Sequence, residues 1–154
     1  MDLGSHMLDL LDFFLGPLTS VQGLAGNQGG YFEAEDTVTA SFGFESGVQG
    51  VASWCFVGPE WIDRTEIVGT KGTVAYSTFD ADPVTLVAGD RTEEFAIPFP
   101  PHVQQPLIQT VVAALNGEGE CPSTGESGAR TSRVLDTILE EYRTRGPRPP
   151  ARKA

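Results

Sequence analysis

The feature that most constrains the fold is a series of short apolar runs in the middle of the chain, joined by turn-forming residues. The runs span residues 18–25, 37–44, 48–56, 64–70, 73–79, 84–88 and 93–97. Apolar residues alternate with small polar ones in the second run, as expected for a strand with one buried face. Parallel pairing would require crossover segments of a dozen or more residues. The short turns therefore predict a largely antiparallel sheet of six or seven strands.

Helical periodicity appears at the two ends of the chain. At the start, Ser5 is a plausible N-cap and Gly16-Pro17 a stop, and helical spacing of apolar residues links them. A second helix is expected over residues 103–115, and a last one from Glu126 or Ser127 to Gly146. The pattern predicts an α+β fold, in which three helices cover one face of a single open sheet.

Size and composition narrow the function classes. The 154 residues fit one domain, which we place at 2–145, and the Pro- and Arg-rich tail at 146–154 is expected to be disordered. A net charge of -11 argues against nucleic acid as a partner. No apolar run approaches the roughly 20 residues that span a bilayer. We expect a soluble, cytoplasmic protein in which Cys55, in a strand, and Cys121, in a loop, are free thiols.

The sheet face opposite the helices is predicted to be flat. Thr39, Ser41 and Gly43 lie along one strand of this face, with Gln49, Ala52 and Trp54 nearby. A face of this kind could be solvated, and it is also suited to sheet-on-sheet packing in a homodimer.

The first helix contains the candidate acid/base residues. Asp2 lies just before its first turn and His6 lies inside that turn. A carboxylate in this position can orient an imidazole, a group that exchanges protons near neutral pH. The segment Gly4-Ser5-His6-Met7 also matches an expression-vector remnant, in which case His6 has no function. Met1-Asp2-Leu3 precedes it and the helical pattern continues through it, which favours a native histidine.

Other candidate sites are weaker. The glycine-rich loop at 26–30 lacks the spacing of either common phosphate-binding loop. Asp80 and Asp82 lack the glycine and distal glutamate of a calcium loop, so a solvated turn is the better interpretation. A hydrolase would need a nucleophile or metal constellation, and the usual motifs for these are missing.

Three segments together resemble the C-terminal domain of the Gfo/Idh/MocA family of NAD(P)-dependent oxidoreductases. The first runs from Asp2 to Gly16. The second combines Asp36-Thr37-Val38 with the later stretch 67–73, and the third is 123–136. The resemblance extends from Asp2 to about Arg143. It implies an open antiparallel sheet, like that of the C-terminal domain of glyceraldehyde-3-phosphate dehydrogenase, used for substrate binding and oligomerisation.

The resemblance also implies roles for individual residues. His6 matches the family's acid/base histidine, and Asp2 matches the aspartate that positions a sugar or polyol substrate. The family's catalytic lysine and dinucleotide-binding loop belong to a Rossmann domain, and this chain contains neither motif. We therefore expect no cofactor bound by this chain alone, NAD or NADP in the intact enzyme, and no activity without the Rossmann half. The start of the chain is expected to lie at a domain boundary.

Two functions remain open at this point. The chain is either the substrate-binding and oligomerisation half of a sugar or polyol oxidoreductase, or a non-catalytic module that dimerises or binds carbohydrate. His102, which follows two prolines, is either a surface residue at the entry of a helix or a substrate contact.

Overall fold

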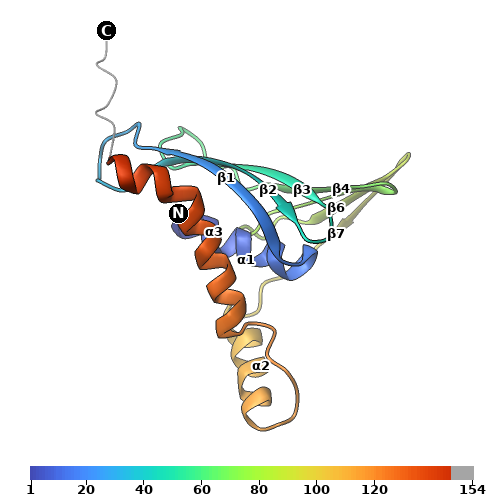
Figure 1. Cartoon of the computed structure of the whole chain (residues 1–154). Helices are drawn as coiled ribbons and strands as arrows, with labels where there is room; N and C mark the ends of the chain where they lie inside the picture. Colours follow the sequence, from blue (N-terminus) through green and yellow to red (C-terminus); the bar gives the residue numbers. More distant parts are fainter. Residues whose placement is uncertain (147–154) are drawn as a thin grey trace. The chain divides into compact units, whose positions relative to one another are not determined.

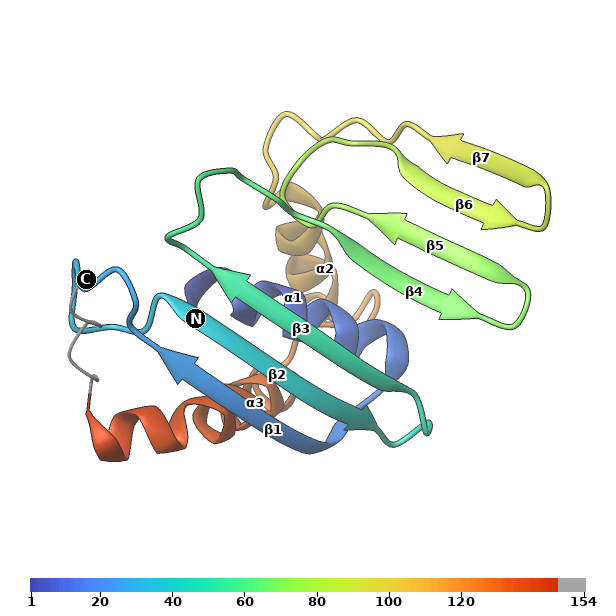
Figure 2. The same ribbon diagram turned by 90° about the horizontal axis from the view of Figure 1, so that it is seen from above.

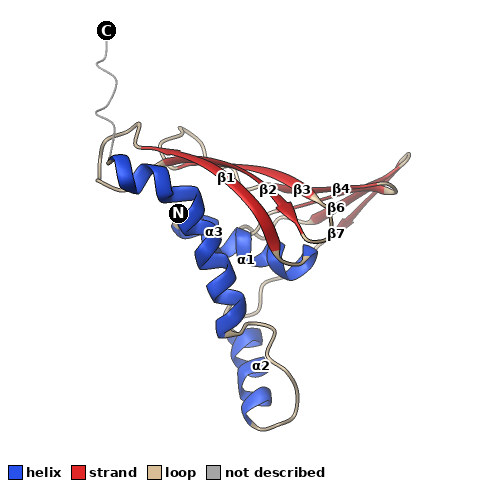
Figure 3. Cartoon of the chain, viewed as in Figure 1, coloured by secondary structure: helices blue, strands red, loops and turns tan. Residues whose placement is uncertain are grey.

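The computed structural model describes residues 1–146, so the predicted tail lies outside the described residues except for Gly146. Figure 3 shows helices near both ends of the chain and strands between them. In chain order the elements are α1 (Asp2–Leu15), β1 (Leu18–Gly26), β2 (Thr37–Phe44), β3 (Gln49–Cys55), β4 (Thr65–Gly69), β5 (Gly72–Tyr76), β6 (Val84–Ala88), β7 (Arg91–Phe95), α2 (Gln105–Leu115) and α3 (Gly125–Arg145). The α+β class and the antiparallel strand pairing are confirmed.

The strands form two sheets where one was predicted. One has the order β1-β2-β3 and the other β4-β5-β6-β7. The break falls at residues 56–64, where Gly58-Pro59 interrupts the strand pattern and proline removes a backbone donor. The chain accordingly divides into two compact units. The first contains residues 1–59 and the described residues from Pro122 onward, and the second contains residues 60–121.

In the first unit, two helices cover one face of a three-stranded sheet (Figures 1 and 2). The central strand β2 explains why: Val38, Ala40, Phe42 and Phe44 are buried, whereas Thr39 and Ser41 between them are exposed. Leu8 of α1 and Ile138 of α3 complete this core and are almost fully buried. The alternation read from the sequence therefore sets which sheet face the helices cover.

Close packing of α3 on β1 depends on one glycine. A Cβ atom added to Gly23 would lie 2.7 Å from the Cα atom of Ile138. No other residue type fits there without moving the helix.

In the second unit, β4 to β7 form a meander of three successive hairpins. Helix α2 has no buried residue, and its apolar positions, including Val111 and Leu115, are exposed. Within neither unit do three helices cover one sheet: α1 and α3 pack on the sheet of the first unit, and α2 belongs to the second unit.

Some predicted element ends were also wrong. Helix α1 begins at Asp2 with Met1 as its N-cap, and the Ser5 hydroxyl donates to the Asp2 carbonyl at 2.6 Å instead of capping the helix. Helix α3 begins at Gly125 because Thr124 and Ser127 cap each other reciprocally. Among residues 1–146, no helix combines the length and the apolar character that a membrane span requires.

Candidate functional site

Asp2 and His6 both lie in the first two turns of α1, and both are exposed. Residues four apart on a helix lie on the same face, with Cβ atoms about 6 Å apart. The two side chains can therefore reach one ligand from one helix face. Gly4, in the first turn, is buried, and a Cβ atom there would lie 2.6 Å from the end of the Met1 side chain and 3.4 Å from the Trp54 ring.

Two polar contacts fix α1 against α3. The carboxylate of Asp12, only 5% exposed, accepts hydrogen bonds from the Arg130 guanidinium, and the shortest measures 2.6 Å from Nη2 to Oδ2. One turn away, the Thr131 hydroxyl donates to Asp9 Oδ1 at 3.1 Å. The hydrogen bond to Asp12 raises the pKa of Arg130 above its ordinary value, so the guanidinium stays charged. These contacts hold the helix that carries Asp2 and His6.

The structure gives the arginine in the 123–136 motif a structural role that sequence reasoning missed. The motif indicated a family, but nothing in the sequence pairs Arg130 with Asp12, 118 positions away. The sequence did contain one signal of this contact. Each of the two helical patterns has a charged residue on its apolar side, Asp12 in the first and Arg130 in the last. A buried charge of this kind requires a partner.

His102 lies in the second unit, in the turn that leads into α2. Its side chain is exposed, and its carbonyl accepts a hydrogen bond from the Gln105 backbone at 2.9 Å. The structure thus places it at a helix entry, and a substrate contact remains a prediction.

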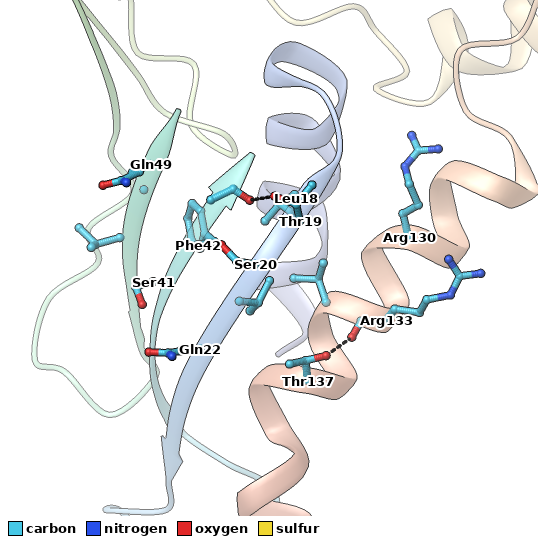
Figure 4. Close-up of a pocket in the computed structure, with 15 residues that line it drawn as sticks. Leu18, Thr19, Ser20, Gln22, Ser41, Phe42, Gln49, Arg130, Arg133 and Thr137 are labelled. Atoms are coloured by element: carbon cyan, nitrogen blue, oxygen red, sulfur yellow. Dashed lines mark hydrogen bonds between the residues drawn. The ribbon is translucent and has the colours of Figure 1, made fainter. Parts of the chain in front are cut away.

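A groove of about 950 Å³ lies in the first unit along β1 and α3 (Figure 4). Sequence reasoning did not identify it. Its polar lining includes Gln22, Ser41 and Gln49, and Arg130 and Arg133 lie at its helical side. In Figure 4 the two guanidinium groups point away from the strand residues. The groove therefore offers hydroxyl and amide groups, not a basic pocket.

The glycine-rich loop does bind an anion, and that anion is the protein's own Asp36. Its carboxylate accepts from the backbone N–H of Gln28 at 2.7 Å and of Gly29 at 2.6 Å. Burial alone would raise the pKa of Asp36. These backbone hydrogen bonds, together with those from the Thr37 hydroxyl and the Gly30 backbone, outweigh burial and lower the pKa. The amides that could have cradled a phosphate are therefore already used.

The described residues do not fit a nicotinamide dinucleotide. A dinucleotide fold presents a glycine turn between a parallel strand and a helix, whereas every strand pair among residues 1–146 is antiparallel. A metal site is not indicated either, because the described residues contain no group of three or more potential ligands. Asp80, considered above for calcium, accepts a hydrogen bond from the Trp61 indole at 2.6 Å.

Helix α1 packs on an antiparallel sheet and presents a carboxylate and an imidazole on one exposed face. Residues 1–75 match the family model described as the GFO/IDH/MocA C-terminal domain. The expected resemblance is confirmed.

Relatives agree with this assignment. An oxidoreductase of Formosa agariphila is 25% identical over 89% of this chain and 42% of its own length. The structure of UDP-N-acetylglucosamine 3-dehydrogenase GnnA from Acidithiobacillus ferrooxidans superposes with a TM-score of 0.77 at 18% identity, over 90% of this chain and 45% of that one. The WlbA dehydrogenase from Bordetella pertussis, in complex with NADH and UDP-GlcNAcA, gives 0.62 at 22% identity, over 97% and 44%. The chain thus spans less than half the length of these relatives.

Proposed function

We propose that this chain is the substrate-binding and oligomerisation half of an NAD(P)-dependent oxidoreductase acting on a sugar or polyol. The observation that carries the proposal is the placement of Asp2 and His6 one turn apart on an exposed face of α1. The contacts of Asp9 and Asp12 with α3 hold that face in place. Relatives that share the fold include dehydrogenases of UDP-sugars.

In this proposal His6 exchanges a proton with the reacting hydroxyl or carbonyl of the substrate. An imidazole is suited to that role because its ring nitrogens can both accept and donate a proton. Asp2, on the same helix face, accepts a hydrogen bond from a substrate hydroxyl and so positions the ring. NAD or NADP supplies the redox chemistry and is bound by residues other than those described here.

The exposed outer face of the first sheet is proposed as a homodimer interface. Thr39, Ser41 and Ser53 give it a flat strip of small side chains, and Leu24 and Val51 project from it at 61% and 84% exposure. Exposed apolar side chains beside a flat sheet surface favour packing against a second copy.

The catalytic part is tested in the two-domain oxidoreductase formed when this chain is joined to a relative's dinucleotide-binding half. Replacing His6 by Gln should lower kcat by about 10²- to 10⁴-fold, the usual contribution of general acid/base catalysis. Asp2→Asn should mainly raise KM. Asp90→Asn, in the exposed turn between β6 and β7, is the control for a lost carboxylate and should change neither constant. Full turnover in the His6→Gln enzyme would remove this histidine from the mechanism.

The cofactor part is tested on the chain alone. Isothermal titration with NADH and NADPH should show no tight binding, and micromolar affinity would contradict the proposal.

The interface is tested by light scattering. Val51→Asp should convert a dimer into a monomer, because it places a charge on the flat face. Val68→Asp, at 77% exposure in the second unit, is the matched control and should leave the dimer intact. A strictly monomeric wild-type chain would rule out the interface.

A further inference from the structure

The face of α1 that carries Asp2 and His6 continues to an exposed aromatic ring. Positions 2, 6, 9 and 13 are spaced by four, three and four residues, which places them on one helix face. Asp9 is half-buried and Phe13 is 63% exposed. The opposite side of the helix is the buried one, with Gly4, Leu8 and Leu11. The face is thus a row of two carboxylates, an imidazole and a phenyl ring.

The length of this row sets the size of a ligand that would use all of it. His6 and Phe13 are seven residues apart, which at 1.5 Å per residue corresponds to about 10 Å along the helix axis. One sugar ring bound at Asp2 and His6 cannot also cover Phe13. A second ring attached to the first would reach it.

The charge of the helix restricts the chemistry of that second ring. This face carries Asp2 and Asp9, and residues 2–15 contain no lysine or arginine. Asp12 lies off this face and is paired with Arg130 of α3, so that arginine is already neutralised. A diphosphate lying along this face would therefore meet two carboxylates, which is unfavourable. A neutral sugar presents hydroxyl donors to Asp9 and an apolar C–H face to an aromatic ring, the arrangement such rings favour.

We propose that Phe13 is a specificity-determining residue that stacks on the second ring of a neutral two-ring carbohydrate, whose first ring lies at Asp2 and His6. This inference rests on the proposed function and adds the class of substrate to it. Phe13 is well suited because it lies beside the Phe14 ring, with centroids 5.6 Å apart, and the contacts of α1 with α3 fix the helix that carries it.

The test uses the two-domain oxidoreductase with three sets of probes: free hexoses, the corresponding neutral disaccharides and the corresponding UDP-hexoses. The wild-type enzyme should show a lower KM for a disaccharide than for its hexose or UDP-hexose. Phe13→Ala should raise KM for the disaccharide about tenfold, leave kcat unchanged, and leave KM for the hexose unchanged. Phe13→Trp, which keeps an aromatic face, should retain the low KM. Phe95→Ala, which removes an aromatic ring at 45% exposure in the second unit, is the control and should leave KM unchanged.

The outcomes separate the two proposals. Loss of kcat in His6→Gln for every probe, together with an unchanged disaccharide KM in Phe13→Ala, would overturn the role of Phe13 and leave the proposed function standing. A preference of the wild type for UDP-hexoses would likewise overturn the neutral ligand. Separate thermal unfolding of the two halves in the Phe13→Ala enzyme, where the wild type unfolds in one transition, would overturn the carbohydrate and show that a protein domain covers the ring. Unchanged turnover in His6→Gln would contradict the function itself.

Discussion

The two units of the chain contain similar strands but bury them differently. In the first unit, α1 and α3 cover the sheet, and the side chains of Leu8, Val38 and Ile138 are almost fully inaccessible. In the second unit, among the described residues, only Thr65 and Ala75 are buried. The first unit therefore has a core made from helices and sheet, whereas the second depends on hairpins and local polar contacts.

The difference shows where precise positions can be held. A packed core resists displacement, so a side chain anchored to it keeps its orientation. Asp2 and His6 lie on a helix of the first unit, and that helix is joined to α3 by the Asp12–Arg130 pair. His102 lies at the entry of α2, which has no buried residue. On physical grounds the first unit is the better place for an acid/base pair.

The largest expected effect comes from truncating the core of the first unit. Replacing Ile138, which is 1% exposed, by Ala should lower the free energy of unfolding by about 2–5 kcal/mol because it removes buried methyl groups and leaves a cavity. Val68→Ala, at 77% exposure in the second unit, should change it by less than about 0.5 kcal/mol. Urea unfolding followed by circular dichroism measures both. Equal losses would mean that the two units do not differ as described.

A smaller effect is expected where the first unit is packed most closely. Gly23→Ala forces a methyl group against the backbone of Ile138 and should cost about 1–3 kcal/mol. Gly26→Ala, in the same strand, is a matched control because a Cβ atom there would contact nothing within 4 Å. The same urea titration checks the pair, and a Gly23→Ala protein as stable as Gly26→Ala would show that α3 does not pack on β1 so tightly.

Much of the fold could be predicted because its signals are local. The alternation at 37–44 and the glycine turns predict antiparallel hairpins, and Gly16 does end α1 with a positive φ of 86°. The division into two sheets could not be predicted, because whether β3 pairs with β4 depends on backbone geometry across residues 56–64. The position of α2 was missed for a related reason: an apolar stripe shows that a helix can be buried, not what buries it.

The candidate site was predictable in part. The sequence predicted Asp2 just before the helix and His6 inside its first turn. The helix starts earlier, at Asp2, so both residues lie on it. The contact between Asp12 and Arg130 was not predictable, because it joins distant segments through tertiary packing. The spacing of the glycine-rich loop argued against a phosphate site, and only the structure shows that its backbone amides donate to Asp36.

The helix cap of α3 should have a moderate effect. Thr124→Ala removes the side chain that accepts from the Ser127 backbone at 3.2 Å and should cost about 1 kcal/mol. Thr144→Ala, near the other end of the same helix, removes a hydroxyl that bonds only to carbonyls of its own last turns and should cost clearly less. Thermal unfolding distinguishes the two, and equal melting temperatures would contradict the cap.

The smallest effect at neutral pH is expected at Asp36, and it is a test of how local polar contacts act within the first unit. Because the pKa of Asp36 is lower in the folded chain, its carboxylate stabilises the fold above the unfolded value of about 3.9, and this contribution is lost as pH falls through the folded value. Asp36→Asn should therefore reduce stability at pH 7 and lessen the loss between about pH 5 and pH 2 relative to wild type. Urea midpoints measured across this pH range give the stability curves of the wild type and of Asp36→Asn.

The control is Asp90→Asn, in an exposed turn of the second unit, which should follow the wild-type curve. Parallel curves for all three proteins would show that the backbone amides of Gln28 and Gly29 do not stabilise the Asp36 carboxylate.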